Sequence, residues 1–554
     1  MVSCSFQRGS FSVVDSGLLP MKISTILTLA VLCLIQFGTM SDNALLANAL
    51  SNLAVDFHTD MGKIQVANAI YPLVCASVMV IAGFLGNSIG WKKLLLIGLL
   101  IIAIAELIAF ISVSFMVFSY VARVLAGIGA GLSIPGVLGY ITMNFSKKDS
   151  VLAFGIIAAV MAVGASAAPI LNGYIIVALS WRVGFLLLAI LFCFAFLASI
   201  PLLQKDALKK EKPANFDFIG AMLLFIGVTL FLFGLSQISS WGFVMPVHAP
   251  FTILNMSPCL FIIVLALVIL FFYLHYEHLR EDRLGHQFVI IPRVFLSNHE
   301  VRAGILMSAF VFFILGGINF ALVLYMQIVL GKNAMVTGLY LSILAFGMAI
   351  ASLGTSAILQ NYSPKQLCRA GIILSILACF VTIFGIGRTD VNSFFYLGLF
   401  FLGVGCGMVA SQANFAVTSA IPDTALASKS MGIQGAARNF GQAIGIALVG
   451  LSIMFGLQYS IHNQVNDNRI LSDYTENLIE IQPNIQFVSN IQLTNLLEHN
   501  SHISPSEKDY IVNINEKARA VAIHASLLVM TLICIVFLFI SFGLIATKLK
   551  DLKK

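Results

Sequence analysis

The sequence predicts an all-α protein that crosses a membrane many times. Of its 554 residues, 59% are hydrophobic and 10% are charged, whereas soluble proteins average about 25% charged residues. Apolar stretches of roughly 20 residues recur from Ile23 to Ala546, and each is long enough to cross a hydrocarbon core of about 30 Å as a helix. Short polar or basic segments separate these stretches, so the chain is expected to be a polytopic helical membrane protein.

A hydropathy window of about 19 residues predicts about fourteen transmembrane helices. The predicted spans are 23–50, 64–86, 93–112, 115–144, 151–178, 181–203, 216–238, 251–275, 300–330, 335–359, 366–387, 393–418, 431–459 and 521–547.

Basic residues mark alternate connections and both ends of the chain. Cytoplasmic connections of membrane proteins carry an excess of Lys and Arg, so these connections and both termini are predicted to be cytoplasmic. The net charge of +7 reflects this topology and gives no indication of nucleic-acid binding. The expected location is the cell membrane, which is the inner membrane if the source is bacterial. The residues are Lys92, Lys93, Lys147, Lys148, Lys205, Lys209, Lys210, Lys212, Arg280, Arg283, Arg293, Lys365, Arg369, Lys429 and the tail KLKDLKK.

The spans divide into six, two and six. LAGIGAGLSIP in the fourth span and FLGVGCGMVAS in the twelfth each hold three glycines two residues apart, as expected of duplicated transporter halves. Chance similarity between Gly-rich membrane helices is the alternative. The glycines are Gly127, Gly129 and Gly131 against Gly403, Gly405 and Gly407.

Four segments follow from this division. They are a cytoplasmic N-terminus (1–22), in which Met21 is an alternative start, an N-terminal six-helix bundle (23–203), a linker with two inserted transmembrane helices (204–293), and a C-terminal six-helix bundle (294–554) that includes a mildly acidic outer loop (460–519) and a cytoplasmic tail.

The motifs of enzymes and metal sites are missing from the sequence. The nine cysteines are scattered and form no CxxC pair. The sequence also lacks a Walker A motif, HExxH and GxSxG. We therefore expect no enzyme, no cofactor, no metal site and no ATP-driven transport by this chain alone.

Four ionisable residues lie inside predicted spans: Asp42, Glu106, Arg123 and Arg438. Each costs at least ~2.5 to 3.5 kcal/mol at a helix centre on insertion scales, so each is a functional candidate. At 100° per residue, Gln36, Thr39, Asp42 and Asn43 form a polar stripe within an arc of roughly 120°.

Three of these residues are predicted to lie at a similar depth. A rise of about 1.5 Å per residue places Glu106 and Arg123 in the outer half of their spans, and Asp42 comes late in the first span. A cluster of two acids and one arginine suits proton coupling, because burial and a nearby Arg shift carboxyl protonation in opposite directions. A permanent Asp42–Arg123 ion pair that fixes bundle packing is the alternative.

Three segments carry distinctive patterns of glycine, proline and charge. They are the loop GFLGNSIGWKK (83–93), the R-x-x-x-G run from Arg123 to Gly127, and ASAAPILNG (165–173). They resemble the gating loop G-x-L-a-D-r-x-G-r-k, the fourth-helix motif and the fifth-helix antiporter motif of the major facilitator superfamily. Asn87 and Ser88 replace that family's acid and arginine, and Ala168 and Asn172 replace glycines.

Other segments resemble one branch of that superfamily, the fourteen-helix drug:proton antiporters. Asp42 with Ala49 and Leu50 fits the first-helix pattern D-x-T-x-x-x-x-A-L, although Ala44 replaces the Thr. SWRVGFLL (180–187) is similar to the entry of helix six, and GIQGAARNFGQAIGIAL (432–448) to helix thirteen. The resemblance covers nearly the whole chain and implies the major facilitator fold with alternating access of two bundles.

The residues and the resemblance together nominate three groups of site residues. Pro169 permits a bend in a span rich in small residues, and ordinary tight packing without gating is the alternative. A polyspecific pocket would use aromatic, Met, Gln and Asn side chains. The groups are proton coupling (Asp42, Glu106, Arg123), gating (Gly83, Asn87, Gly90, Lys92, Pro169, Gly173) and substrate binding (Gln36, Asn319, Tyr325, Gln327, Gln412, Asn414).

The resemblance implies a proton-coupled exporter of amphipathic or cationic small molecules. The expected partners are a small-molecule substrate, protons, membrane lipid and, in a Gram-negative cell, a periplasmic adaptor protein. One alternative is a specific exporter or importer of one metabolite or siderophore. Another is a membrane sensor or scaffold that transports nothing.

Overall fold

The structure is a computed structural model of the whole chain. It describes residues 23–58, 61–204, 217–246, 249, 251–332, 334–359, 361–387, 390–466, 490–498 and 504–544. The expected cytoplasmic N-terminus, including Met21, and the tail KLKDLKK lie outside the described residues.

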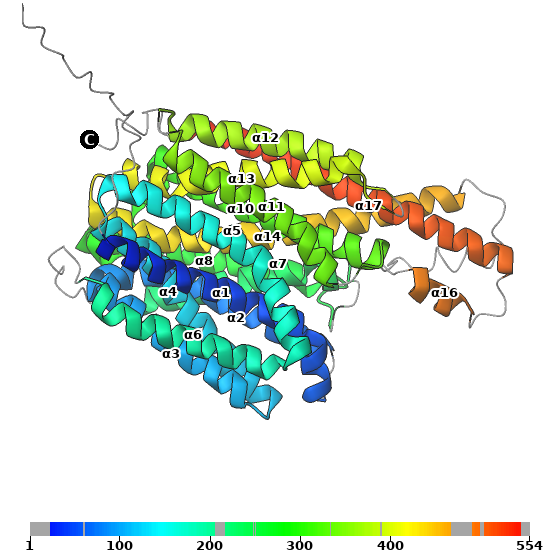
Figure 1. Ribbon diagram of the computed structural model, residues 1–554, viewed down its shortest axis with the longest axis horizontal. Helices are drawn as coiled ribbons and strands as arrows, with labels where there is room; N and C mark the ends of the chain where they lie inside the picture. The colour runs from blue at the N-terminus through cyan, green and yellow to red at the C-terminus, as the bar shows by residue number, and fades with distance from the viewer. Residues whose placement is uncertain are drawn as a thin grey trace, which may run out of the picture.

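The described chain is helical and contains fourteen helices long and apolar enough to span a membrane, as the sequence predicted. Figure 1 shows them lying roughly side by side along the long axis of the molecule. The α-helices are α1 (Ile23–Asp56), α2 (Met61–Ile89), α3 (Trp91–Ile111), α4 (Arg123–Asn144), α5 (Lys147–Ala178), α6 (Trp181–Leu202), α7 (Phe218–Trp241), α8 (Pro258–Leu284), α9 (Arg293–Ser297), α10 (His299–Val323), α11 (Ala334–Ala357), α12 (Pro364–Gly385), α13 (Ser393–Ala420), α14 (Thr424–Asn466), α16 (Asn490–Glu498) and α17 (Pro505–Ile540).

Four short helices of other types complete the described set. Two are π-helices and two are 3₁₀ helices. They are η1 (Val117–Ala122) and η3 (Leu324–Val329), and η2 (His286–Phe288) and η4 (Ser541–Gly543).

The eighth span was predicted about two turns too early, at 251–275. Helix α8 begins at Pro258 because the Ser257 hydroxyl caps it, accepting a hydrogen bond from Cys259 N at 3.3 Å. The helix continues beyond the apolar stretch through its polar end, where the Glu277 carboxylate accepts hydrogen bonds from Ile290 N and the Tyr273 hydroxyl. A hydropathy window registers neither the cap nor this pairing.

The stretch 460–519, predicted as an outer loop, contains helical segments at both ends and at Asn490–Glu498. Helix α14 continues to Asn466, and α17 begins at Pro505 with a capping box between Ser504 and Glu507. The 43 residues of α14 would extend about 65 Å, far more than a hydrocarbon core. Figure 1 shows the ends of α14 and α17 projecting from the molecule beside α16.

The two glycine triplets have the same packing role in both halves. A Cβ at Gly127 or Gly131 would lie 2.9 or 2.8 Å from a backbone carbonyl of α2, and one at Gly129 would lie 2.6 Å from Ile102 N of α3. In the second half, Gly403 and Gly407 meet α11 in the same way, and Gly405 meets α12. Each central helix thus fits closely between two neighbours because its glycines lack side chains.

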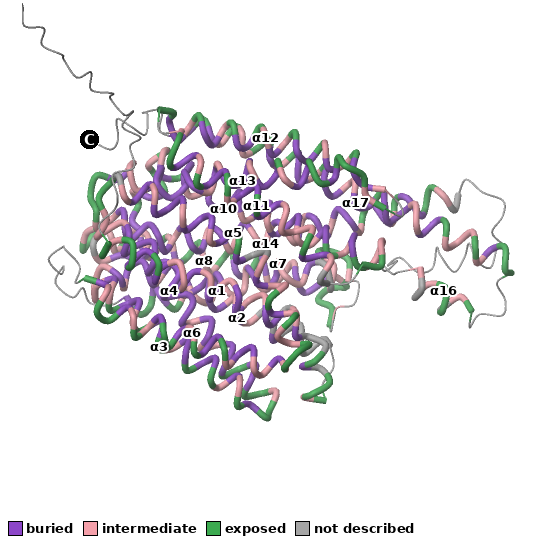
Figure 2. Tube along the Cα trace, in the orientation of Figure 1, coloured by how far each residue is buried: buried purple, intermediate pink, exposed green. Residues whose placement is uncertain are grey.

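The inserted helices α7 and α8 pack mainly against each other, and α7 also packs on α2 and α14. Buried residues line the interior of both bundles, and exposed residues lie along the outer faces (Figure 2). Many exposed residues of the spans are large and apolar, such as Leu100, Phe194 and Phe271, as expected for helices that face lipid.

Candidate functional site

Arg123 lies between two carboxylates in the interior of the N-terminal bundle. Its Nη2 donates to Asp42 Oδ1 at 2.7 Å, and its Nη1 lies 3.5 Å from Glu106 Oε1. The three side chains come from α4, α1 and α3, and none has any solvent exposure. The structure therefore brings together all three residues that the sequence nominated for proton coupling.

Aromatic rings surround the guanidinium of this cluster. The carbon Cζ of Arg123 lies 4.9 Å from the ring centre of Tyr71 and 5.5 Å from that of Phe185, distances at which cation–π attraction contributes. Sequence reasoning missed both rings. Aromatic residues make up 11% of the chain, and only the tertiary contact distinguishes these two.

Several polar atoms at this level have no hydrogen-bond partner. They are Asp42 Oδ2, Glu106 Oε2, Arg123 Nε and both amide atoms of Gln36. Since buried polar atoms are almost always paired with protein or ordered water, the unpaired atoms of the cluster can take up a proton or a water.

Local features of α4 place Arg123 in the cluster. The π-helix η1 ends directly before Arg123, and π-helical turns are frequent at functional sites. One turn further on, Gly127 lets α4 approach the Tyr71 carbonyl of α2. The R-x-x-x-G spacing therefore combines a charged side chain with a close helix contact.

Asn87, one of the predicted gating residues, joins the two halves at the end where α1 begins and α2 ends. Its Nδ2 donates to Ala425 O at 2.5 Å, and its Oδ1 accepts from Ser428 Oγ at 2.8 Å and from Trp91 Nε1 at 3.1 Å. Ala425 and Ser428 belong to α14. The neutral amide thus donates across the bundle interface, which an acid at this position could not do while ionised.

Gly83 brings the backbones of α2 and α14 together beside Asn87. A Cβ on Gly83 would collide with Lys429 O and lie 3.3 Å from the Cα of Gly432. A Cβ on Gly432 would lie 2.9 Å from the Cα of Gly83. The two halves are therefore closed against each other at this end.

Gly90 and Lys92 act within the N-terminal half. Gly90 precedes α3 with φ of 98°, a backbone conformation that favours glycine. Lys92 Nζ donates to Ile200 O at 2.7 Å and Leu203 O at 2.5 Å, so it binds the last carbonyls of α6.

Pro169 and its neighbours hold α5 to α1. The Pro169 carbonyl accepts from Asn48 Nδ2 at 2.6 Å. Asn172, which replaces a glycine of the family pattern, donates to Ser41 O at 2.8 Å and accepts from Ser41 Oγ at 3.3 Å. A Cβ on Gly173 would meet only Asn48 Nδ2, at 3.8 Å, so packing does not demand a glycine there.

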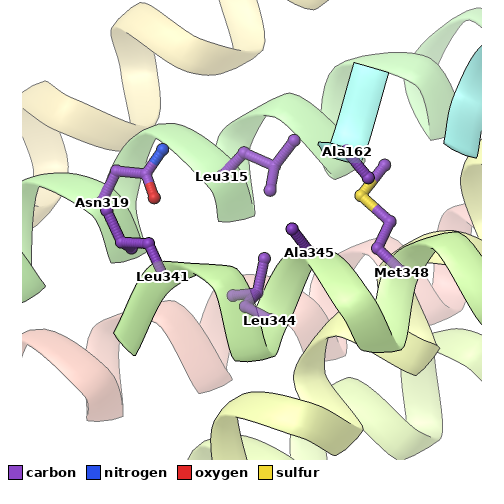
Figure 3. A pocket seen from close by; sticks show the side chains of 7 residues that line it. All are labelled: Ala162, Leu315, Asn319, Leu341, Leu344, Ala345 and Met348. Carbon is purple, nitrogen blue, oxygen red and sulfur yellow. The ribbon is translucent and has the colours of Figure 1, made fainter. Parts of the chain in front are cut away.

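A cavity with an empty volume of about 250 Å³ lies between the halves (Figure 3). Asn319 is the polar residue of its lining, and the other six residues are apolar. This volume includes space open to solvent, and the enclosed room is only about 10 Å³, roughly that of one water molecule. The cavity in this state is therefore too small for a drug-sized molecule. The lining comes from α5, α10 and α11: Ala162, Leu315, Asn319, Leu341, Leu344, Ala345 and Met348.

The other substrate candidates do not line this cavity. Gln412 and Asn414 are buried in α13, and Gln412 Oε1 has no hydrogen-bond partner. Tyr325 is buried in η3, where its hydroxyl donates to Gly387 O at 2.8 Å and accepts from Gly387 N at 3.1 Å. Gln327 is exposed.

Comparison with known proteins decides the family. Residues 32–446, well over half of the chain, match the Major Facilitator Superfamily. The chain belongs to this superfamily. The family resemblance found in the sequence is thus confirmed, and this major facilitator is a multi-pass membrane transporter of small molecules.

Its relatives in sequence and in structure agree with this assignment. It is 24% identical to the probable actinorhodin transporter of Streptomyces coelicolor, over 75% of this chain and 70% of that protein. It is also 24% identical to the tetracenomycin C resistance and export protein of Streptomyces glaucescens, over 74% and 72% of the two chains. The crystal structure of the human organic anion transporter MFSD10 (TETRAN) matches with a TM-score of 0.53 and 14% identity, over 77% and 92% of the two chains. At this identity the structural match shows the fold alone.

Proposed function

We propose that this major facilitator is a proton-coupled exporter of amphipathic or cationic small molecules. The observation that carries the proposal is the buried Asp42–Arg123–Glu106 cluster. Two carboxylates and one guanidinium sum to one negative charge when all are ionised. Because an uncompensated buried charge costs several kcal/mol, one bound proton completes the charge balance of the cluster.

Alternating access then links this proton to the solute. The halves close at the end marked by Asn87, Gly83 and Gly432, so the proposal has the cluster exchange protons with the opposite side when the halves part there. Basic residues on the connections at the closed end support a cytoplasmic location for it and for both termini. Opening that end would release the proton inward and admit a solute for export.

The names of the two Streptomyces relatives, a probable transporter and a resistance and export protein, support export of a small molecule. A specific exporter or importer of one metabolite or siderophore would share the same coupling cluster. A sensor that transports nothing would not need a cluster that binds a proton.

Everted membrane vesicles test the proposal. After respiration acidifies their interior, ethidium as a cationic probe and cholate as an amphipathic probe are added, and the pH gradient is followed. Wild type should lose part of the gradient on addition of a transported probe, and Asp42→Asn should not, because an amide cannot release a proton. Asp423→Asn makes the same chemical change at an exposed position and should behave as wild type. A response that persists in Asp42→Asn would refute the assigned role, and no response to any solute of a broad panel would refute antiport.

A further inference from the structure

Arg438 is a buried cation at the interface of the two halves. It lies on α14, is 7% exposed, and contacts Met161 of the N-terminal half through Nη1 and the methionine sulfur at 3.8 Å. Its Nη2 donates to Asn414 Oδ1 at 2.7 Å, and its Cζ lies 5.6 Å from the ring centre of Phe312. Helices α5, α10, α13 and α14 therefore all meet at this side chain.

Arg438 differs from Arg123 because no acid balances its charge. Among the described residues, the ion pairs involve Arg123, Arg280 and Arg293 and leave Arg438 without a carboxylate. Its acceptors are one neutral amide oxygen and one thioether sulfur, which is a weak acceptor. A buried charge that no carboxylate balances is costly, so the site favours an anionic group from outside the protein.

The cavity between the halves adjoins this cation. Ala162 of its lining follows Met161 in α5, and Leu315 lies one helical turn from Phe312 on α10. Figure 3 shows the lining side chains of α5, α10 and α11 around one space. The lining is apolar except for Asn319. An apolar group that enters this space when the halves part would thus lie beside a positive charge.

We propose that Arg438 determines substrate specificity by binding an anionic group, and that the solute is an apolar ring or chain system bearing one carboxylate or similar acid. This inference rests on the proposed transport function and narrows its substrate class from amphipathic or cationic solutes to amphipathic anions. The acid replaces the weak methionine contact and receives charge-assisted hydrogen bonds from the guanidinium. Because Met161 and Arg438 belong to different halves, the bound solute contacts both bundles.

Equilibrium binding to the full-length protein in lipid nanodiscs tests this assignment without a proton gradient. The probes are 2-naphthoate and its methyl ester, which share one ring system and differ in the negative charge, each corrected for partition into empty discs. Wild type should bind naphthoate about tenfold or more tighter than the ester, as expected for hydrogen bonds to a charged group. Arg438→Gln should remove that preference and leave ester binding unchanged, while Arg438→Lys should keep part of it. Arg302→Gln, a change at an exposed position of α10, should match wild type.

Asn414→Asp provides a second variant that keeps Arg438 itself. The new carboxylate would lie in the position of the amide oxygen that Nη2 contacts at 2.7 Å, pair with the guanidinium and compete with the probe. Naphthoate binding should fall about tenfold or more, with ester binding retained. Equal or absent binding of both probes to wild type, or equal loss of both in the variants, would overturn the assignment. Charge-selective binding without solute-dependent proton movement would instead refute proton coupling and leave the Arg438 site standing.

Discussion

Arg123 is expected to couple more strongly to Asp42 than to Glu106. The N–O distances are 2.7 and 3.5 Å, and at an effective dielectric constant of about 20 unit charges at these separations attract by about 6 and about 5 kcal/mol. The coupling energy of the Asp42–Arg123 pair should therefore exceed that of the Glu106–Arg123 pair by about 1 kcal/mol. Arg123→Gln alone should lower the free energy of unfolding by about 3–5 kcal/mol, because it leaves a buried carboxylate uncompensated.

Double-mutant cycles measure these quantities. The variants Arg123→Gln, Asp42→Asn and Glu106→Gln, with the two doubles that include Arg123→Gln, are unfolded in dodecyl maltoside micelles with increasing dodecyl sulfate and followed by circular dichroism. Asp42→Asn should restore much of the stability that Arg123→Gln removes, and Glu106→Gln should restore less. Arg302→Gln serves as an exposed arginine control. A coupling energy near zero between Asp42 and Arg123, or a larger one between Glu106 and Arg123, would refute the interpretation that Asp42 is the main partner of Arg123.

Three further changes test the contacts around the site. Gly83→Ala places a methyl group against Lys429 O and Gly432, so the distance between spin labels at Lys93→Cys and Asn361→Cys, in a background without native cysteines, should increase. Gly354→Ala, where a Cβ meets nothing within 4 Å, should leave that distance unchanged. Equal label distances in the two variants would contradict the clash. Asn87→Asp sets a carboxylate against the Ala425 carbonyl that the amide now contacts at 2.5 Å, which should weaken the closed end by about 1–3 kcal/mol. Labelling of a cysteine at the buried Ser430 should then rise, and unchanged labelling would show that the amide does not hold the halves together. Tyr325→Phe removes both hydrogen bonds to Gly387 and should lower the free energy of unfolding by about 1–2 kcal/mol without changing transport; lost transport at unchanged stability would instead support the substrate-binding role predicted from the sequence.

Sequence reasoning located the charged centre because charge inside a membrane span is rare and costly. Asp42, Glu106 and Arg123 could be nominated from hydropathy alone, and helical rise placed them near one level. Sequence reasoning could not select Tyr71 and Phe185, since aromatic residues also occur as ordinary packing residues. For the same reason it could not decide that Asn319 lines a cavity while the Tyr325 hydroxyl binds the backbone of Gly387. Sequence reasoning nominated Asn87 only through a family pattern and could not foresee that the Asn87 side-chain amide donates a hydrogen bond to Ala425 O.

The sequence by itself determined the number of spans, the division into six, two and six helices and the short set of buried charges. These properties depend on local composition, because lipid requires a run of about 20 apolar residues for each helix wherever the helix finally packs. Only the tertiary structure decided which charges are balanced. Arg123 and Arg438 look alike in the sequence, each an arginine in an apolar span, yet one lies 2.7 Å from a carboxylate and the other contacts an amide and a sulfur. That difference depends on which helices meet at each side chain, and it separates a candidate proton site from a candidate anion site.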